Sequence, residues 1–211
     1  MRADLTDITL VVDRSGSMSS CQSEAQGGIN AFIADQKTKP GEAIFSLLQF
    51  DTEHEYVFNA VPIKTVERYD LNPRGMTALL DAVGKAINEA GARLSTIPEE
   101  NRPGLVVFAI VTDGQENSSH EFKKAQIKDM ITKQQDQFKW QFTFLGANQD
   151  AFTEAGAMGI SAAATANYSA QKSGSAYQAL SNNISQMRVS CSVGEAVNSF
   201  YSDEERKRMA K

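Results

Sequence analysis

The stretch ITLVVDRSGS, residues Ile8–Ser17, carries most of the information about the fold. Five apolar or β-branched residues run without interruption up to Val12, which is typical of a strand covered on both faces in a parallel sheet. The run ends on Asp13, and hydroxyl side chains follow at Ser15 and Ser17. A buried strand that ends on a carboxylate surrounded by hydroxyls predicts a polar site at the edge of a sheet.

A second strand ends in the same way, because Leu105–Val111 runs directly into Thr112-Asp113-Gly114. The runs Ala43–Phe50 and Tyr56–Ile63 are separated by a short polar joint and predict an antiparallel hairpin. Residues 140–145 also predict a strand, and residues 160–168 show a weaker strand pattern. The spacing of apolar residues predicts helices over residues 21–36, 77–94, 122–137, 151–158 and 173–187.

Strands that alternate with helices predict an α/β fold. We expect a Rossmann-like three-layer α/β/α sandwich whose central sheet is mostly parallel, with one antiparallel edge strand. Two local features add detail. Gly27-Gly28 inside the first helix either weakens that helix or allows close packing. Ser118–Glu121 has the spacing of a capping box and predicts the start of the helix at 122–137.

Composition excludes several classes of function. A net charge of −5, from 21 basic and 26 acidic residues, argues against a nucleic-acid partner, because phosphates need a basic surface. No apolar run approaches the roughly 20 residues needed to cross a bilayer, so we expect no membrane partner. The N-terminus lacks the apolar core of a secretory signal. Cys21 and Cys191 are interpreted as free thiols of a cytoplasmic protein, with a single disulfide as the alternative.

The two similar strand ends predict a metal site. Ligands of open parallel sheets bind beyond the carboxyl ends of strands, where the strand order reverses. If the two strands are neighbours there, Asp13 and Asp113 face one crevice, and a divalent cation relieves their repulsion. Ser15 and Ser17 add neutral oxygen ligands. Oxygen ligands without imidazole or thiolate favour Mg²⁺, or Mn²⁺, over zinc or copper.

Three motifs in order resemble those of von Willebrand factor type A (VWA) domains. Asp13–Ser17 fits the DxSxS signature, Gly75-Met76-Thr77 resembles the second motif, and Thr112-Asp113-Gly114 resembles the third. The resemblance extends over about residues 5–190. It implies a VWA domain at 1–190, and we expect residues 191–211 to be a C-terminal appendage with a short helix.

The resemblance also implies a metal-ion-dependent adhesion site (MIDAS). In such a site Ser15, Ser17 and Thr77 coordinate the cation directly, while Asp13 and Asp113 do so directly or through water. The last coordination position is left for an acidic residue of a partner protein. The resemblance therefore implies a Mg²⁺-dependent protein-binding module that recognises an exposed Asp or Glu side chain.

Alternatives to this interpretation are a capping loop and an enzyme. Asp13, Ser15 and Ser17 are also suited to capping a helix, and Thr77 is equally suited to an N-cap. A Mg²⁺-dependent phosphotransferase or hydrolase is the rival function. It is disfavoured because position 15 is Ser rather than a second Asp, no lysine follows the strand at 140–145, and phosphate-loop and GxSxG motifs are missing. We therefore expect no enzymatic activity.

Residues flanking the motifs are expected to form the rim that contacts the partner. Arg74 is expected to pair with a partner carboxylate, and Met76 to supply an apolar contact. The layout resembles intracellular bacterial and phage VWA proteins, many of which work beside an AAA+ ATPase or in a multi-protein assembly. The full predicted rim is Arg14, Met18, Arg74, Met76, Gln115, Glu116 and Asn148.

Overall fold

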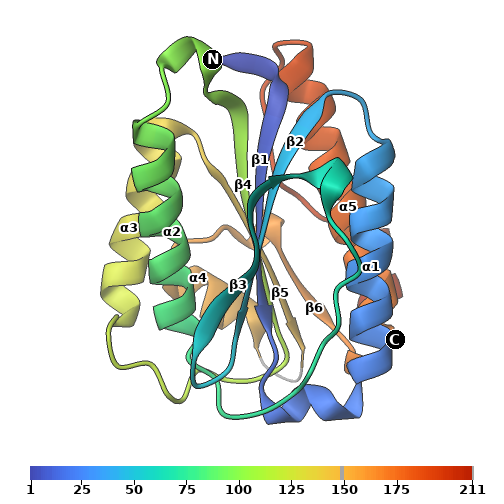
Figure 1. The fold of residues 1–211 in the computed structure, drawn as a ribbon. Helices are drawn as coiled ribbons and strands as arrows, with labels where there is room; N and C mark the ends of the chain where they lie inside the picture. The colour runs from blue at the N-terminus through green and yellow to red at the C-terminus, as the bar shows by residue number, and fades with distance from the viewer. Residues whose placement is uncertain (148–149, 211) are drawn as a thin grey trace.

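The computed structural model describes residues 1–147 and 150–210 and shows a six-stranded sheet between two layers of helices (Figure 1). The strand order is β3-β2-β1-β4-β5-β6. β3 runs antiparallel to β2, and the other neighbouring strands are parallel, which confirms the predicted fold class. The strands are β1 Arg2–Asp13, β2 Glu42–Phe50, β3 His54–Pro62, β4 Pro103–Thr112, β5 Gln141–Ala147 and β6 Thr165–Tyr168.

The helices divide between the two faces of the sheet. In Figure 1, α1 and α5 cover one face, and α2, α3 and α4 cover the other. Among the described residues, no helix is long and apolar enough to cross a bilayer. The helices are α1 Gln22–Thr38, α2 Leu79–Ser95, α3 Lys124–Phe138, α4 Ala151–Ala157, α5 Ser173–Ser192 and α6 Asp203–Ala210.

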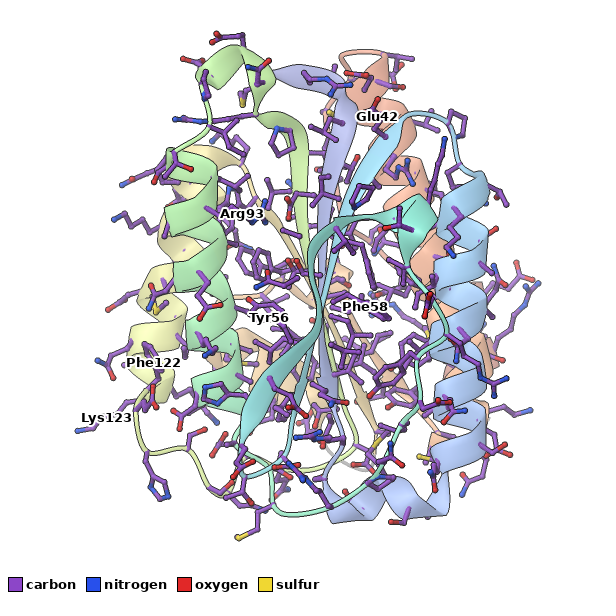
Figure 2. The ribbon with its side chains drawn as sticks, in the orientation of Figure 1. Glu42, Tyr56, Phe58, Arg93, Phe122 and Lys123 are labelled. Atoms are coloured by element: carbon purple, nitrogen blue, oxygen red, sulfur yellow. The ribbon has the colours of Figure 1, made fainter. Side chains whose placement is uncertain are left out.

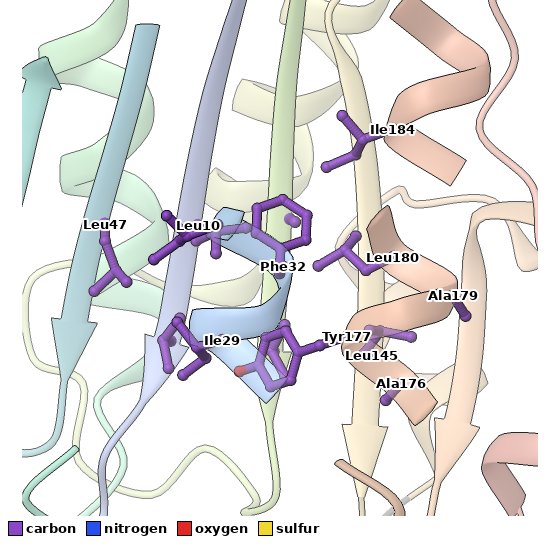
Figure 3. Packing of buried hydrophobic residues seen from close by; sticks show 14 of the residues in the cluster. Leu10, Ile29, Phe32, Leu47, Leu145, Ala176, Tyr177, Ala179, Leu180 and Ile184 are labelled. Carbon is purple, nitrogen blue, oxygen red and sulfur yellow. The ribbon is translucent and has the colours of Figure 1, made fainter. Parts of the chain in front are cut away.

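The central strands β1 and β4 are apolar on both faces because helices cover both. In β1, Leu10 and Val12 pack in the cluster beneath α1 and α5, whereas Val11 joins the cluster beneath α2. Figure 3 shows Leu10 of β1 and Leu47 of β2 among side chains of α1 and α5. Double burial explains the uninterrupted apolar runs that predicted these strands.

The edge strand β3 contains a bulge that the sequence pattern does not reveal. Phe58 pairs with Leu47 and Tyr56 pairs with the next residue, Leu48, so β3 has one extra residue between them. Because a bulge places two residues opposite one, residues two apart on either side of it point to opposite faces of the sheet. Tyr56 packs with the α2 layer and Phe58 with the α1 layer, as Figure 2 shows.

Two predicted helices begin later than expected. α2 begins at Leu79 rather than at residue 77, and α3 begins at Lys124 rather than at residue 122. The Ser119 hydroxyl accepts hydrogen bonds from the N–H groups of Leu80 and Asp81. Ser119, inside the predicted capping box, thus serves the first turn of α2, not that of α3.

The C-terminal segment packs against the sheet. The Tyr201 hydroxyl lies 2.7 Å from the Thr143 hydroxyl of β5, and both Tyr201 and Met209 belong to the buried core. The Ser169 N–H also donates to the Met209 carbonyl of α6, at 2.8 Å. The division at residue 190 stays a prediction, although α5 continues to Ser192.

Gly28 allows α1 and α5 to pack closely. A Cβ at Gly28 would lie 2.6 Å from Cδ2 of Tyr177 and 3.2 Å from the Ser173 carbonyl oxygen. A Cβ at Gly27 would meet no atom of the described chain within 4 Å. The two glycines therefore differ in their surroundings. Gly27 is exposed to solvent, whereas Gly28 lies in the contact between α1 and α5.

Substituting these neighbouring glycines by alanine should have opposite effects. We expect Gly28→Ala to lower the free energy of unfolding by about 1–3 kcal/mol, because the added methyl group overlaps the Tyr177 ring. We expect Gly27→Ala to raise it by about 0.5–1 kcal/mol, since alanine loses less backbone entropy in a helix. Urea unfolding of both variants measures this, and equal effects would contradict the assignment of Gly28 to the helix contact.

Candidate metal centre

The strand order reverses between β1 and β4. From β1 the chain continues outward to β2 and β3 on one side, and β4 continues to β5 and β6 on the other. Val12 pairs in register with Val111, so the ends of both strands lie side by side. Asp13 therefore lies next to Thr112 and Asp113, at the position where open α/β sheets bind ligands.

The two carboxylates are buried. Asp13 is 0% exposed and Asp113 is 3% exposed. Asp13 accepts hydrogen bonds from the Ser15 N–H and the Thr112 hydroxyl, each at 2.6 Å. Asp113 accepts one at Oδ1 from the Ser17 hydroxyl, also at 2.6 Å. Its other oxygen, Oδ2, is buried without a hydrogen-bond partner in the described part of the chain.

Hydroxyl oxygens converge on the same place from two other segments. The Ser15 and Ser17 hydroxyls lie 3.0 Å apart. A Cβ at Gly114 would lie 3.1 Å from Thr77 Oγ1, 3.6 Å from Ser17 Oγ and 3.7 Å from Asp13 Oδ2. The structure thus brings all five predicted ligands into one cluster, and Gly114 leaves the space between them open.

The hydroxyls do not serve as helix caps. Ser15 precedes the short 3₁₀ helix Gly16–Ser20 but makes no side-chain capping hydrogen bond. The residue before α2 is Ala78, so Thr77 is not its N-cap. Asp13, by contrast, does accept from the N–H two residues later, as in an Asx turn. The capping alternative therefore accounts for Asp13 but not for the three hydroxyls.

The pKa values of the two carboxyls shift in the direction expected for a site that needs a cation. Burial raises the pKa of Asp13, opposed by hydrogen bonds from Thr112 and Ser15. Burial raises the pKa of Asp113 as well. The hydrogen bond from Ser17 lowers this pKa, whereas the negative charge of Asp13 raises it further. The negative charges are thus costly in this place unless a positive charge joins them.

This donor set fits a hard divalent cation. It offers two carboxylates and three neutral hydroxyls, and an unpartnered carboxylate oxygen points to a missing ligand. Within residues 1–147 and 150–210, no group of three or more His, Cys, Asp or Glu side chains forms a metal cluster. The candidate centre contains only two such residues, and hydroxyls complete it. Oxygen ligands of this kind suit Mg²⁺ or Mn²⁺.

The predicted rim residues differ in their exposure to solvent. Met76 is 51% exposed, and Arg74 and Gln115 are also exposed next to the cluster. Arg14 and Met18 are buried instead, so neither side chain is available to a partner. Met18 packs in the core beneath α1, because the 3₁₀ turn after Ser15 directs it inward.

The remaining rim predictions concern the loop after β4 and the end of β5. Glu116 is half-buried and accepts hydrogen bonds from the N–H groups of Leu80, Ser118 and Ser119. It therefore holds the loop to α2 rather than facing solvent freely. Asn148 lies outside the described residues.

Arg14 belongs to a buried ion-pair network beside the centre. Arg14 and Arg74 both donate from Nε to Oδ2 of Asp51, at 2.7 and 2.8 Å. Arg14 also donates to Glu55 at 2.6 Å. Burial raises the pKa of the Asp51 carboxyl, but the hydrogen bond from Arg74 and the two guanidinium charges outweigh burial and lower it. The sequence offered one signal for Asp51, which directly follows the apolar run of β2.

Comparisons with known proteins show which fold this is. No protein-family model matches the sequence, and no curated protein matches it. Proximal thread matrix protein 1 from the mussel byssus has a similar structure, with a TM-score of 0.60, 17% identity, and coverage of 89% of this chain and 46% of that one. A von Willebrand factor type A protein from Catenulispora acidiphila has a TM-score of 0.60, 15% identity, and coverage of 86% and 43%.

A third similar structure is the manganese-loaded TRAP protein of Plasmodium vivax, with a TM-score of 0.56, 14% identity, and coverage of 82% of this chain and 72% of that one. The chain spans less than half the length of the mussel and Catenulispora proteins. At these identities the likeness shows the fold, which is that of von Willebrand factor type A domains.

Removing one charge from the centre should not lower the thermal stability of the metal-free protein, but it should abolish the stabilisation by Mg²⁺. In the absence of divalent ions, we expect the thermal unfolding midpoint of Asp113→Asn to equal or exceed that of the wild type, because repulsion from Asp13 is gone. With Mg²⁺, the wild-type midpoint should rise and that of the variant should not. Differential scanning calorimetry measures both. Asp136→Asn, at an exposed position of α3, is the control and should respond to Mg²⁺ like the wild type.

Proposed function

We propose that this chain is a metal-dependent protein-binding module. Its centre holds Mg²⁺ and, through it, an acidic side chain of a partner protein. The observation that carries the proposal is the convergence of three hydroxyl side chains on two buried carboxylates, one of which has an unpartnered oxygen. The proposed ligands are Asp13, Ser15, Ser17, Thr77 and Asp113.

Each side chain has a distinct task in this proposal. Asp13 and Asp113 supply the two negative charges that balance the dication, and the hydroxyls fill positions without adding charge. Thr112 and the Ser15 N–H fix the orientation of the Asp13 carboxylate through hydrogen bonds. A bound cation supplies an electrophilic position for an outside carboxylate.

Two structures with the same fold support a divalent metal ion at this position, although neither contains Mg²⁺. One crystal structure of the mussel byssus protein has zinc in its MIDAS motif, and the TRAP protein was crystallised loaded with manganese. For this chain we propose Mg²⁺ as the resident ion, with Mn²⁺ able to replace it, since all five side chains donate oxygen.

The proposed partner surface is the exposed edge around the centre. Ser17, Met76 and Gln115 face solvent there. Arg74 is 56% exposed although it pairs with Asp51 and Glu53, so its guanidinium adds positive potential next to the metal position. An acidic partner side chain flanked by an apolar residue fits this surface. We propose no catalytic role for these residues.

The cellular setting follows from less direct observations. Cys21 and Cys191 are both free thiols, and Cys21 is buried. Free thiols fit a reducing compartment, so we propose a cytoplasmic protein. By analogy with the intracellular bacterial and phage proteins that the motifs resemble, we propose that the partner belongs to a multi-protein assembly, such as one containing an AAA+ ATPase.

The function can be tested with short peptides that differ only in their central residue. Peptides with Glu or Asp at the centre should bind the wild-type protein in Mg²⁺ and lose binding in EDTA. Peptides with Gln or Asn should bind in neither condition, because an amide cannot replace the anionic ligand. Arg74→Ala should weaken binding of the acidic peptides by about threefold to tenfold, because the guanidinium is partly exposed and its attraction for a carboxylate is partly screened.

Two controls make the peptide result interpretable. Asp13→Ala should abolish both the response to Mg²⁺ and the binding of acidic peptides. Arg68→Ala, at an exposed arginine outside the centre, should bind like the wild type. Equal binding of Glu and Gln peptides, or equal binding in Mg²⁺ and EDTA, would contradict a metal-bridged contact.

A further inference from the structure

Thr77 is held by a neighbouring loop rather than by the helix that follows it. α2 begins at Leu79, so Thr77 lies outside its regular hydrogen bonding. Both backbone polar groups of Thr77 are nonetheless satisfied, and Asn117 bonds to each. The Thr77 N–H donates to Oδ1 of Asn117 at 2.9 Å, and the Thr77 carbonyl accepts from the Asn117 N–H at 3.0 Å.

The two bonds close a small ring between Thr77 and Asn117. A side-chain oxygen holds one end of the threonine backbone and a main-chain N–H holds the other, so rotation about its φ and ψ angles breaks a hydrogen bond. The Ser118 N–H lies 3.3 Å from the same carbonyl and reinforces that end. Held in this way, Thr77 Oγ1 borders the same space as Ser17 Oγ and Asp13 Oδ2, since a Cβ at Gly114 would lie within 3.7 Å of all three.

Contacts from the end of β2 hold the residues on either side of Thr77. The Met76 N–H donates to the Thr52 hydroxyl at 3.0 Å, and the Ala78 N–H donates to the Asp51 carbonyl at 2.8 Å. These contacts fix where the segment runs. Asn117, by contrast, contacts Thr77 itself and so sets the direction of its side chain.

The loop that carries Asn117 also carries Asp113. Glu116 joins this loop to α2 by accepting a hydrogen bond from the Leu80 N–H, at 3.0 Å. The segments bearing two of the proposed ligands, Asp113 and Thr77, are therefore linked directly. Displacing one segment disturbs the other through the ring at Asn117.

We propose that Asn117 is a positioning residue of the metal centre, which holds the Thr77 hydroxyl in place before the cation binds. This inference rests on the proposed function. A ligand that is already oriented loses less conformational entropy on binding, so its holder raises metal affinity without touching the metal. Mutating a group that orients a metal ligand through a hydrogen bond commonly lowers metal affinity by about 10- to 100-fold.

The test measures Mg²⁺ affinity by isothermal titration calorimetry, and the unfolding midpoint of the EDTA-treated protein in parallel. Asn117→Ala removes the side-chain acceptor and should weaken Mg²⁺ binding about tenfold. Asn117→Asp keeps an oxygen in the same place and should bind Mg²⁺ at least as tightly as the wild type. Asn72→Ala, at another exposed loop asparagine, is the control and should bind like the wild type.

A double-mutant cycle tests whether Asn117 changes Mg²⁺ affinity through the Thr77 hydroxyl. Thr77→Val removes the hydroxyl while keeping the shape of the side chain. If Asn117 acts through Thr77, adding Asn117→Ala to Thr77→Val should weaken Mg²⁺ binding no further. Asn117→Ser, whose shorter side chain cannot reach the Thr77 N–H, replaces the alanine variant if that variant does not fold.

Other outcomes separate this inference from the function on which it rests. Wild-type Mg²⁺ affinity in Asn117→Ala, even with a lowered unfolding midpoint, would make Asn117 a purely structural residue and overturn the inference alone. A full tenfold loss that persists in the Thr77→Val background would also overturn it. Absence of Mg²⁺ binding to the wild-type protein would overturn the proposed function and the inference together.

Discussion

Two carboxylates buried side by side at the ends of β1 and β4 are the constraint on which the rest of the site depends. The sheet brings Asp13 and Asp113 together because parallel neighbours end at the same edge. Both carboxylates are buried there, beneath the loops that carry Ser17 and Thr77. Burial and mutual repulsion both oppose ionisation, so hydrogen bonds from Ser17, Ser15 and Thr112 can only partly stabilise the charges. In the proposed function, a bound cation balances these charges.

The neighbouring ion-pair network shows how the same protein treats a buried carboxylate that needs no metal. Asp51 directly follows β2 at the same edge of the sheet and is also buried, but two arginines donate to it. The pKa of Asp51 is lowered, whereas the pKa values of Asp13 and Asp113 are raised. No arginine or lysine in the described structure pairs with Asp13 or Asp113, and in the proposed function a bound cation supplies the positive charge.

Sequence patterns predicted the strands and helices, whose apolar residues recur at regular spacing, and the polar motifs at the ends of these elements. Continuous apolar runs gave the parallel sheet, and a polar joint between two runs gave the hairpin. The five candidate ligands proved to be close together because their motifs follow strand ends or precede a helix. The bulge in β3 was not predictable, since pairing in register depends on the neighbouring strand.

Features that depend on contacts between distant loops were also beyond prediction. Arg14 and Met18 flank the ligands in sequence, but a tight turn directs both side chains inward, where Asp51 and the core receive them. Asn117 has no distinguishing local pattern, and its role arises from the approach of the loop after β4 to Thr77. Met209, at the far end of the chain, is buried against a core that local periodicity does not reveal.

The most direct test of the central claim is an anomalous difference map from crystals soaked in Mn²⁺. The account predicts one strong peak at the carboxyl ends of β1 and β4, within coordination distance of Ser15, Ser17 and at least one of the two buried carboxylates. In crystals of Asp13→Ala the peak should be missing. A wild-type map with no peak between these side chains, or with manganese bound only elsewhere on the surface, would contradict the account.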